Sequence, residues 1–350
     1  MPRVMVAMSG GVDSSVAAML LHRQGAEVVG VTMCLGVAGN GSGQPACCGP
    51  DAVADARRVC DLLGLPHHVL DFSRELRDAV IEPFITEYRA GRTPNPCVRC
   101  NRHLKFGSLL AKARAMGFDG LATGHYAHIT RGPWGTRLQR PADQRKDQTY
   151  FLYAMPREAL DTVLFPLADL RKAQVRALAA EAGLPVAGKD ESQDICFAGA
   201  GNYRRILDSC GAALGPFVDT DGRVLGTHQG VAAYTVGQRK GLGIAAGKPL
   251  YVIAIRPDSN TVVLGERGHL LSRGLVASQL NLLVESLPDR AHAMIRYTHP
   301  AAPARVTVEG DTMTVRFNEP QEAVTPGQSV VLYDGETVLG GGIIENALTA

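Results

Sequence analysis

The chain has 350 residues, of which 45% are hydrophobic and 20% charged, and its formal net charge is only +2. These values are ordinary for a globular protein, predict two or three domains and exclude a global basic field. No apolar run approaches the ~20 residues that span a bilayer, so we expect a cytoplasmic protein with no membrane partner. In the cytoplasm, the eight cysteines are expected to be thiols, metal ligands or redox groups rather than disulfides.

The first half of the chain alternates predicted strands and helices. Residues 36–50 are rich in glycine and are predicted to form a loop. Pro83 lies inside the predicted helix Arg74–Arg89, where proline is unfavourable. Strands are predicted over Arg3–Met8, Glu27–Leu35, His67–Phe72 and Gly120–His125, and helices over Val12–Gln24, Pro50–Leu63 and Arg74–Arg89. Such an alternation predicts an α/β domain in which helices cover a parallel sheet.

The second half of the chain changes character after about residue 200. Short strands with β-branched residues are separated by turn residues, and we expect a boundary between two β modules at Leu271–Gly274. The predicted strands are Leu250–Ile255, Thr261–Leu264, Ala304–Val308, Met313–Phe317 and Val330–Tyr333. This density of strands and turns indicates antiparallel sheets or barrels.

The string Ser9-Gly10-Gly11-Val12-Asp13-Ser14-Ser15 lies between the first predicted strand and the first predicted helix. Its glycines let backbone N–H groups gather at a helix N-terminus, which favours binding of a phosphate group. The Asp13 carboxylate is an oxygen ligand of the kind that Mg²⁺ takes. No Gly-Lys-Ser/Thr follows, so the string is not a Walker A loop. It resembles the loop of the ATP-pyrophosphatase superfamily, whose members cleave ATP to AMP and pyrophosphate and adenylate a substrate oxygen.

Two cysteines follow the stiff segment Arg92-Thr93-Pro94-Asn95-Pro96, at positions 97 and 100. Between residues 92 and 105 the chain has four cations and no acid, and nearby positive charge lowers a thiol pKa toward the range where the thiolate dominates. A lone C-x-x-C is often half of a zinc site, but no second pair completes one here. A third candidate thiol, Cys196, lies in Asp194-Ile195-Cys196-Phe197.

Several longer strings resemble the tRNA-specific 2-thiouridylase (tRNA-uridine 2-sulfurtransferase) family over nearly the whole chain. Besides residues 9–15 and 91–96, they are Ala122-Thr123-Gly124-His125-Tyr126, Lys146-Asp147-Gln148-Thr149-Tyr150-Phe151-Leu152, the string at 194–197, Thr235-Val236-Gly237-Gln238-Arg239-Lys240-Gly241-Leu242-Gly243 and Val324-Thr325-Pro326-Gly327-Gln328. The resemblance implies a nucleotide-binding domain like the adenine nucleotide alpha hydrolases (1–203), a small central β domain (204–272) and a C-terminal β-barrel (273–350).

The resemblance also implies site residues and partners. Cys100 matches the nucleophile and Cys196 the persulfide cysteine. The positions that contact ATP, which is used with Mg²⁺, are Ala7, Met8, Ser9, Gly10, Gly11, Val12, Asp13, Ser14, Met33 and Gly124. Asn95, Pro96 and Cys97 match the stretch facing the target base, and the tRNA-contacting positions are His125, Lys146, Asp147, Gln148, Arg296, Tyr297 and Gln328. The implied partners are the anticodon loop of tRNA and a sulfur-donor protein.

One residue departs from the family pattern: well-known members carry Asp where this chain has Cys97. A thiol is a weaker hydrogen-bonding group with a higher pKa than a carboxyl. Three thiols, Cys97, Cys100 and Cys196, are then available to hold an iron–sulfur cluster with an open fourth site, which is an alternative to direct persulfide transfer. Another ATP-pyrophosphatase-loop ligase is a further alternative, although it needs neither a cysteine pair nor a basic string at 92–105.

Overall fold

The structure, a computed structural model, describes residues 1–38, 45–46, 50–133, 135–190 and 213–348. The chain divides into two compact units. The first unit comprises Met1–Val80, Cys97–Phe197 and Glu336–Val338, and the second comprises Ile81–Pro96, Ala198–Gly335 and Leu339–Ala350. Among the described residues, no helix combines the length and the apolar character needed to cross a membrane.

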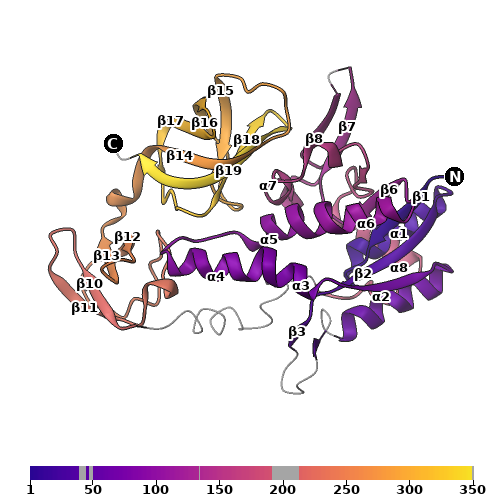
Figure 1. Cartoon of the computed structure of the whole chain (residues 1–350), viewed down its shortest axis with the longest axis horizontal. Coiled ribbons are helices and arrows are strands. Elements are labelled where there is room, and N and C mark those ends of the chain that lie inside the picture. The colour runs from indigo at the N-terminus through magenta and orange to yellow at the C-terminus, as the bar shows by residue number, and fades with distance from the viewer. Residues whose placement is uncertain (39–44, 47–49, 134, 191–212, 349–350) are drawn as a thin grey trace. The chain divides into compact units, whose positions relative to one another are not determined.

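The first unit holds a parallel sheet with helices packed against it (Figure 1). Its strands are β1 (Arg3–Ala7), β2 (Glu27–Cys34), β5 (His67–Asp71), β6 (Gly120–Thr123) and β9 (Val163–Leu164), in the order β5-β2-β1-β6-β9. The described helices are α1 (Val12–Arg23), α2 (Pro50–Leu63), α3 (Ser73–Leu76), α5 (Pro96–Arg99), η2 (Cys100–Leu109), α6 (Leu110–Ala115), η3 (Gln144–Lys146), α7 (Thr149–Leu152), η4 (Arg157–Ala159) and α8 (Lys172–Glu181). A hairpin of β7 (His128–Gly132) and β8 (Gly135–Gln139) belongs to the same unit.

The strands of the sheet run parallel, and helical segments lie between its successive strands along the chain. Val4↔Val28 and Val6↔Ala122 pair on the two sides of β1, so the central strand is buried on both faces. Strands buried in this way read as continuous apolar runs. Helices α1 and α8 pack against each other, and α1 also contacts β1 and β6. The predicted α/β class is confirmed.

The second unit contains two β structures and helix α4 (Glu82–Arg89). A small sheet has the order β11-β10-β13-β12, and six further strands close into a barrel of order β14-β17-β16-β15-β18-β19 because β19 also pairs with β14. The bounds are β10 (Gly215–Val218), β11 (Val224–His228), η5 (Val231–Ala233), β12 (Tyr251–Arg256), β13 (Thr261–Gly265), η6 (Arg267–Leu270), β14 (Leu271–Leu282), β15 (Arg290–Met294), β16 (Ala302–Glu309), β17 (Thr312–Glu322), β18 (Ser329–Asp334) and β19 (Thr337–Leu348). The predicted small β domain and C-terminal barrel are confirmed.

Alternation of apolar residues builds the barrel core. Along β16, Ala304 and Val306 are buried while Pro303, Arg305 and Thr307 are exposed. Inward-pointing residues from the other strands, such as Leu275, Val315 and Leu332, complete the core. This period of two is the pattern of a strand with one face on the core.

Three sequence expectations need correction. The cysteines are not all outside disulfides, because Cys34 at the end of β2 is disulfide-bonded. The segment 36–50 is not loop throughout, because β3 (Val37–Ala38) pairs with β4 (Pro45–Ala46) in two-residue strands too short to show a periodicity. The predicted helix Arg74–Arg89 is not one α-helix: a π-helical stretch, η1 (Arg77–Ile81), separates α3 from α4. Pro83 then lies in the first turn of α4, where its missing N–H costs little.

Candidate functional site

The loop Ser9–Ser15 lies at the carboxyl end of β1, where the chain order of the sheet reverses. From β1 the chain proceeds to β2 and β5 on one side, and it later adds β6 and β9 on the other side. Such a reversal leaves a crevice at the carboxyl ends of the two central strands, which is where open α/β sheets bind ligands. The predicted loop and the Gly124-His125-Tyr126 segment after β6 therefore both occur at the expected position.

Hydrogen bonds between serine side chains and the backbone fix the shape of this loop. Ser14 Oγ accepts from the Ser9 N–H (3.1 Å), and Ser15 Oγ donates to the Gly11 carbonyl (2.8 Å). Gly124 packs against the loop, since a Cβ on it would lie 2.6 Å from the Ser14 nitrogen. Gly10, Gly11 and Gly124 thus bring two of the predicted ATP-binding strings together, while Met33 lies half-buried near the end of β2.

Gly10 is the residue for which no side chain fits. Its φ is +70°, and a Cβ would lie 2.2 Å from the Ala52 carbonyl oxygen in α2. Both the left-handed conformation and the close approach require glycine. Gly64 provides a contrast, because it has a similar φ of +67° but no atom within 4 Å of an added Cβ.

We expect Gly10→Ala to lower the melting temperature more than Gly64→Ala and to abolish the further rise that ATP causes. The left-handed conformation costs both variants about 1–2 kcal/mol, whereas only Gly10→Ala also forces α2 away from the loop. Thermal melting with and without ATP measures both effects. Equal ATP-dependent shifts in the two variants would contradict the assigned role of the loop.

The Asp13 carboxylate, on the first turn of α1, is bound by two other side chains of the first unit. Lys172 Nζ, at the start of α8, donates to both oxygens at 2.7 and 2.8 Å. The buried Tyr126 donates its hydroxyl to Oδ1 at 2.9 Å. The same Tyr126 holds Gln148 through its backbone, with the N–H donating to Oε1 at 2.9 Å. The strings 9–15 and 122–126 therefore meet at the Asp13 carboxylate, and Gln148 joins the string 146–152 to them through the Tyr126 backbone.

This arrangement does not fit Mg²⁺ at Asp13. Both carboxylate oxygens already accept from an ammonium group, and a cation directly on them would face the positive charge of Lys172. Among the described residues, no cluster of three or more histidine, cysteine, aspartate or glutamate side chains has the proximity that a metal ion needs. We therefore do not expect Asp13 to bind Mg²⁺ directly.

A second lysine also reaches the loop. Lys189 Nζ donates to the Gly10 carbonyl (3.0 Å) and to Asp55 Oδ2 (2.6 Å). Neither Lys172 nor Lys189 was found from the sequence. Lys172 begins α8 and Lys189 follows this helix. Neither lysine has a motif around it, so only the packing of α8 against α1 reveals their positions. Together the two lysines give positive charge to a loop already suited to anions.

The C-x-x-C cysteines lie on helical structure with a π-helical segment. Cys97 is on α5 and half-buried, whereas Cys100 begins η2 and is 5% exposed. The helix is anchored on both sides, since Arg99 Nε donates to the Ala79 carbonyl (2.8 Å) and Asn101 Nδ2 donates to the Phe151 carbonyl (2.9 Å). π-helical segments are frequent at functional sites, and here one fixes the backbone that carries Cys100.

Positive charge surrounds this helix. Burial and the charges of Arg99 and Arg102 lower the pKa of His103 below its usual value. The same cations favour a thiolate on the neighbouring turn. Cys60 is the contrasting thiol, because burial and the Asp61 carboxylate raise its pKa to about 11. The third predicted cysteine, Cys196, lies outside the described residues, as do Cys47 and Cys48.

His125 connects the segment after β6 to the cysteine helix. Lys105 Nζ donates to its Nε2 at 3.4 Å, so the ring proton is on Nδ1, which donates to Thr123 Oγ1 at 2.7 Å. The ring packs between Phe106 and Phe165. Burial and the Lys105 charge hold the pKa of His125 well below 6.5, and the ring is neutral at pH 7. Its predicted contact with RNA stays a prediction.

This low pKa gives a dependence of stability on pH. In the unfolded chain His125 is protonated below about pH 6.5, whereas in the folded chain it is protonated only at lower pH. The contribution of neutral His125 to stability is therefore complete above about pH 6.5 and is lost as the pH falls below it. We expect the free energy of unfolding to decrease between pH 7.5 and 5.5 less steeply in His125→Asn than in the wild type. Urea unfolding at several pH values measures this. Parallel pH profiles would contradict the assignment.

The predicted RNA-contacting string at 146–148 is largely engaged inside the first unit. Asp147 accepts from Arg140 Nη1 (2.7 Å) and from the Thr149 N–H (2.9 Å), and is 9% exposed. Gln148 accepts from Tyr126, as described above. Lys146 is half-buried. The structure thus gives Asp147 and Gln148 a role in shaping the site, and direct RNA contacts by this string stay a prediction.

In the second unit, hydrogen bonds fix the backbone that precedes the cysteines. The Thr93 N–H donates to the Pro326 carbonyl (2.9 Å), and Gln328 Nε2 donates to the Thr93 carbonyl (2.8 Å). Arg92 forms ion pairs with Glu87 and Glu345, both at 2.6 Å. The string 324–328 therefore holds the segment that continues into Asn95 and Pro96. Gln328 positions this backbone, and its RNA contact stays a prediction.

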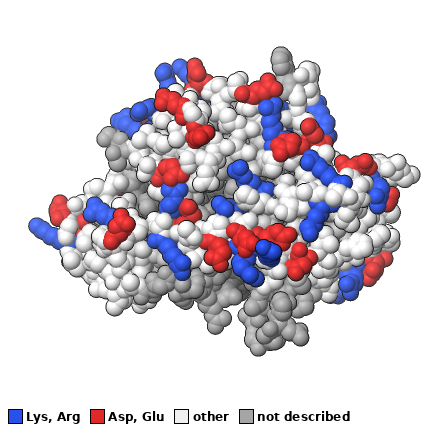
Figure 2. Space-filling view, viewed as in Figure 1, with Lys and Arg blue, Asp and Glu red and all other residues white. Residues whose placement is uncertain are grey.

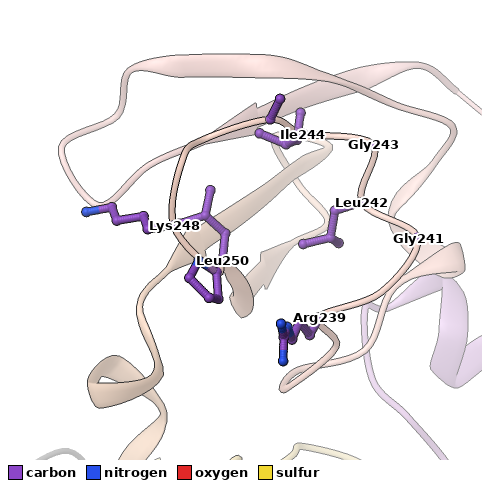
Figure 3. Close-up of a pocket in the computed structure, with 9 residues that line it drawn as sticks. Arg239, Gly241, Leu242, Gly243, Ile244, Lys248 and Leu250 are labelled. Atoms are coloured by element: carbon purple, nitrogen blue, oxygen red, sulfur yellow. The ribbon is translucent and has the colours of Figure 1, made fainter.

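The remaining predicted tRNA contacts also belong to the second unit. Arg296 Nη2 donates to the Glu322 carbonyl (3.0 Å), while its buried Nε has no hydrogen-bond partner among the described residues. Tyr297 is 37% exposed. Arg239 and Lys240 are also exposed, and Arg239 lines a hollow of about 380 Å³ in the small β domain. Its other cation, Lys248, extends away from the hollow (Figure 3) and pairs with Glu266 at 2.5 Å, so the two cations do not converge.

Comparison with known proteins gives matches along the whole chain. Family models match residues 2–200 (tRNA methyl transferase HUP domain), 205–266 (tRNA methyl transferase PRC-barrel domain) and 272–344 (aminomethyltransferase beta-barrel domain). The chain is 53% identical to a tRNA-specific 2-thiouridylase MnmA 1 of Syntrophus aciditrophicus, over 99% of this chain and 93% of that protein. It is 51% identical to a tRNA-specific 2-thiouridylase MnmA of Carboxydothermus hydrogenoformans, over 99% and 98% of the two chains.

Proposed function

Because the chain belongs to the tRNA-specific 2-thiouridylase family, we propose that it uses ATP to replace O2 of the wobble uridine of tRNA with sulfur. Relatives that span nearly the whole chain carry this activity in their names. The observation that supports it most directly is the meeting of the loop 9–15, Gly124 and Tyr126 at the reversal point of the sheet. We expect the protein to work in the cytoplasm.

The first step is activation of the uridine. The polyphosphate of ATP binds at the N-terminus of α1, where backbone N–H groups and the helix dipole favour negative charge. Lys172 and Lys189 neutralise the phosphates from the side. Uridine O2 attacks the α-phosphorus, pyrophosphate leaves, and the AMP attached to O2 becomes a good leaving group.

The second step delivers sulfur. A donor protein loads Cys196 as a persulfide, whose terminal sulfur attacks C2 and displaces AMP. The Cys100 thiolate then attacks the Cys196 sulfur, which leaves the transferred sulfur on the base and closes a Cys100–Cys196 disulfide. Alternatively, Cys100 liberates sulfide from the persulfide, and the sulfide attacks C2. A thiol reductant reopens the disulfide. Support comes from Arg99 and Arg102, which flank Cys100 in the sequence, because nearby positive charge favours a thiolate.

Recognition of the RNA is the third component of the proposal. The target base leaves the anticodon stack at a cost of a few kcal/mol, which is lowest for an unpaired loop base. Asn95, Pro96 and Cys97 face this base, and the firm anchoring of Thr93 supports a fixed backbone for that contact. The tRNA is further contacted by His125, Lys146, Asp147, Gln148, Arg296, Tyr297 and Gln328.

Mass spectrometry of nucleosides tests the whole reaction. Purified protein is incubated with unmodified tRNA, ATP, Mg²⁺ and a persulfide source, and the tRNA is then digested. We expect 2-thiouridine at the wobble position and one pyrophosphate released per thiolation, with neither product when ATP or tRNA is omitted. Rapid pyrophosphate release without tRNA, together with unmodified tRNA, would point to another ligase that shares this loop.

A further inference from the structure

Three exposed arginines lie side by side on the outer wall of the barrel. Arg290 on β15 is directly opposite Arg305 on β16, and Arg305 is directly opposite Arg316 on β17. All three side chains are exposed, while their neighbours Ala291, Ala304 and Val315 point into the core. We call Arg290, Arg305 and Arg316 the arginine row.

The arginine row is unfavourable for the fold. Neighbouring strands are about 4.8 Å apart, and like charges directly opposite each other destabilise a sheet. No ion pair found between described residues includes any of the three. On the face seen in Figure 2, cations and acids are interspersed. Three unneutralised arginines at consecutive pairing positions therefore indicate a ligand that supplies the negative charge.

A hollow lies beside the row. It has a volume of about 460 Å³, and its polar lining consists of Arg290, His292, Arg305, Asn318 and Asp334. Four of these five side chains offer N–H donors, and Asp334 is the one acid. The hollow is thus large enough, and rich enough in donors, to take up part of an anionic ligand.

We infer that the arginine row binds the phosphate backbone of the tRNA substrate, which rests on the proposed function. Guanidinium groups match phosphate oxygens in a bidentate geometry, and a row of them across strands suits a repeated anion. Outward positions next to the row are His292, Pro303, Thr307 and Thr314, which do not form the large apolar core of a protein–protein interface. Of the described side chains that line the hollow, His292 has the one aromatic ring, so successive bases have no row of aromatic rings on which to stack, and the contact is to the backbone and independent of sequence.

This contact is separate from the predicted contacts with the base. It involves neither the C-x-x-C segment nor Arg296, Tyr297 or Gln328. Loss of the row therefore weakens capture of tRNA and leaves the chemical steps intact once tRNA is bound.

The test compares Arg305→Gln and Arg305→Glu with Arg223→Glu, a matched charge reversal of an exposed arginine beside β11. Binding of full-length tRNA is measured between 50 and 200 mM salt. We expect Arg305→Glu to weaken binding about fivefold or more at low salt, and Arg305→Gln to reduce the slope of log K against log [salt] by about one. Arg223→Glu should match the wild type.

Two further readouts separate a ligand contact from a structural role. Because Arg305→Glu removes two like-charge pairs, its melting temperature should equal or exceed that of the wild type. Its kcat at saturating tRNA should be unchanged while KM for tRNA rises. Unaltered tRNA binding, or a loss confined to transfer of sulfur from an acidic donor protein, would overturn the inference. If the wild type itself fails to thiolate tRNA, the proposed function fails instead.

Discussion

Replacing Lys172 by Met should slow tRNA-dependent release of pyrophosphate by about 10²–10³-fold, the effect of removing one charge-stabilising donor from a reaction centre. Lys172 Nζ lies on the Asp13 carboxylate at the N-terminus of α1, where we propose that the polyphosphate binds. Its positive charge is held there before ATP arrives. Pyrophosphate release measured by a coupled assay, with saturating tRNA, reports the effect.

Two variants separate the action of Lys172 on phosphate from simple support of Asp13. Lys172→Arg keeps the charge and should retain substantial activity. In the double variant Asp13→Asn/Lys172→Met no unpaired carboxylate remains, so its melting temperature should recover while pyrophosphate release stays slow. Recovery of activity in the double variant would mean that Lys172 serves only as the partner of Asp13.

Replacing Cys100 or Cys196 by Ser should abolish formation of 2-thiouridine and leave tRNA-dependent pyrophosphate release measurable. A hydroxyl at pH 7 can neither carry a persulfide nor act as a comparable nucleophile, whereas the ATP loop contains neither cysteine. Cys60→Ser is the matched control, because the Cys60 thiol is buried with a pKa of about 11. Nucleoside mass spectrometry and pyrophosphate release are measured on the same samples. Substantial thiolation by Cys100→Ser or Cys196→Ser would exclude the proposed sulfur step.

Cys97 distinguishes persulfide transfer from a cluster. Under the proposed scheme Cys97→Asp restores the residue of well-known family members and keeps activity. Anaerobically purified wild type should then be active without iron or acid-labile sulfide. Activity that follows iron content, and is lost in Cys97→Asp, would favour the iron–sulfur alternative.

Much of the fold was predictable where the local pattern was strong. The helix Pro50–Leu63 has the predicted bounds, and β1 and β2 each end one residue before the predicted end. The strands β3 and β4 were missed because two residues are too few to show an alternation of apolar and polar side chains. Helix α8 was missed because no recognisable motif marks its segment of the chain. The domain limits 1–203, 204–272 and 273–350 stay a prediction.

The site was predictable as strings but not as contacts. Gly10 and Asp13 were predictable because glycine and small polar residues between a strand and a helix favour a phosphate-binding turn, whereas Gly124 was implied by the family resemblance. Lys172 was missed because it lies 159 positions from Asp13 in sequence, and no local rule joins residues at that separation. Conversely, Asp147 and Gln148 look like free polar groups in the sequence, and only the fold reveals their internal partners.

The pairing of β14 with β19 has a consequence for synthesis of the chain. The barrel has no open edge once β19 is in place, but β14 is made first and β19 last of the six strands. Until β19 emerges from the ribosome, β14 presents unpaired backbone groups of the kind that recruit other strands. The nascent chain is therefore most prone to aggregation late in translation, and a stop codon before β19 would leave an open sheet rather than a smaller barrel.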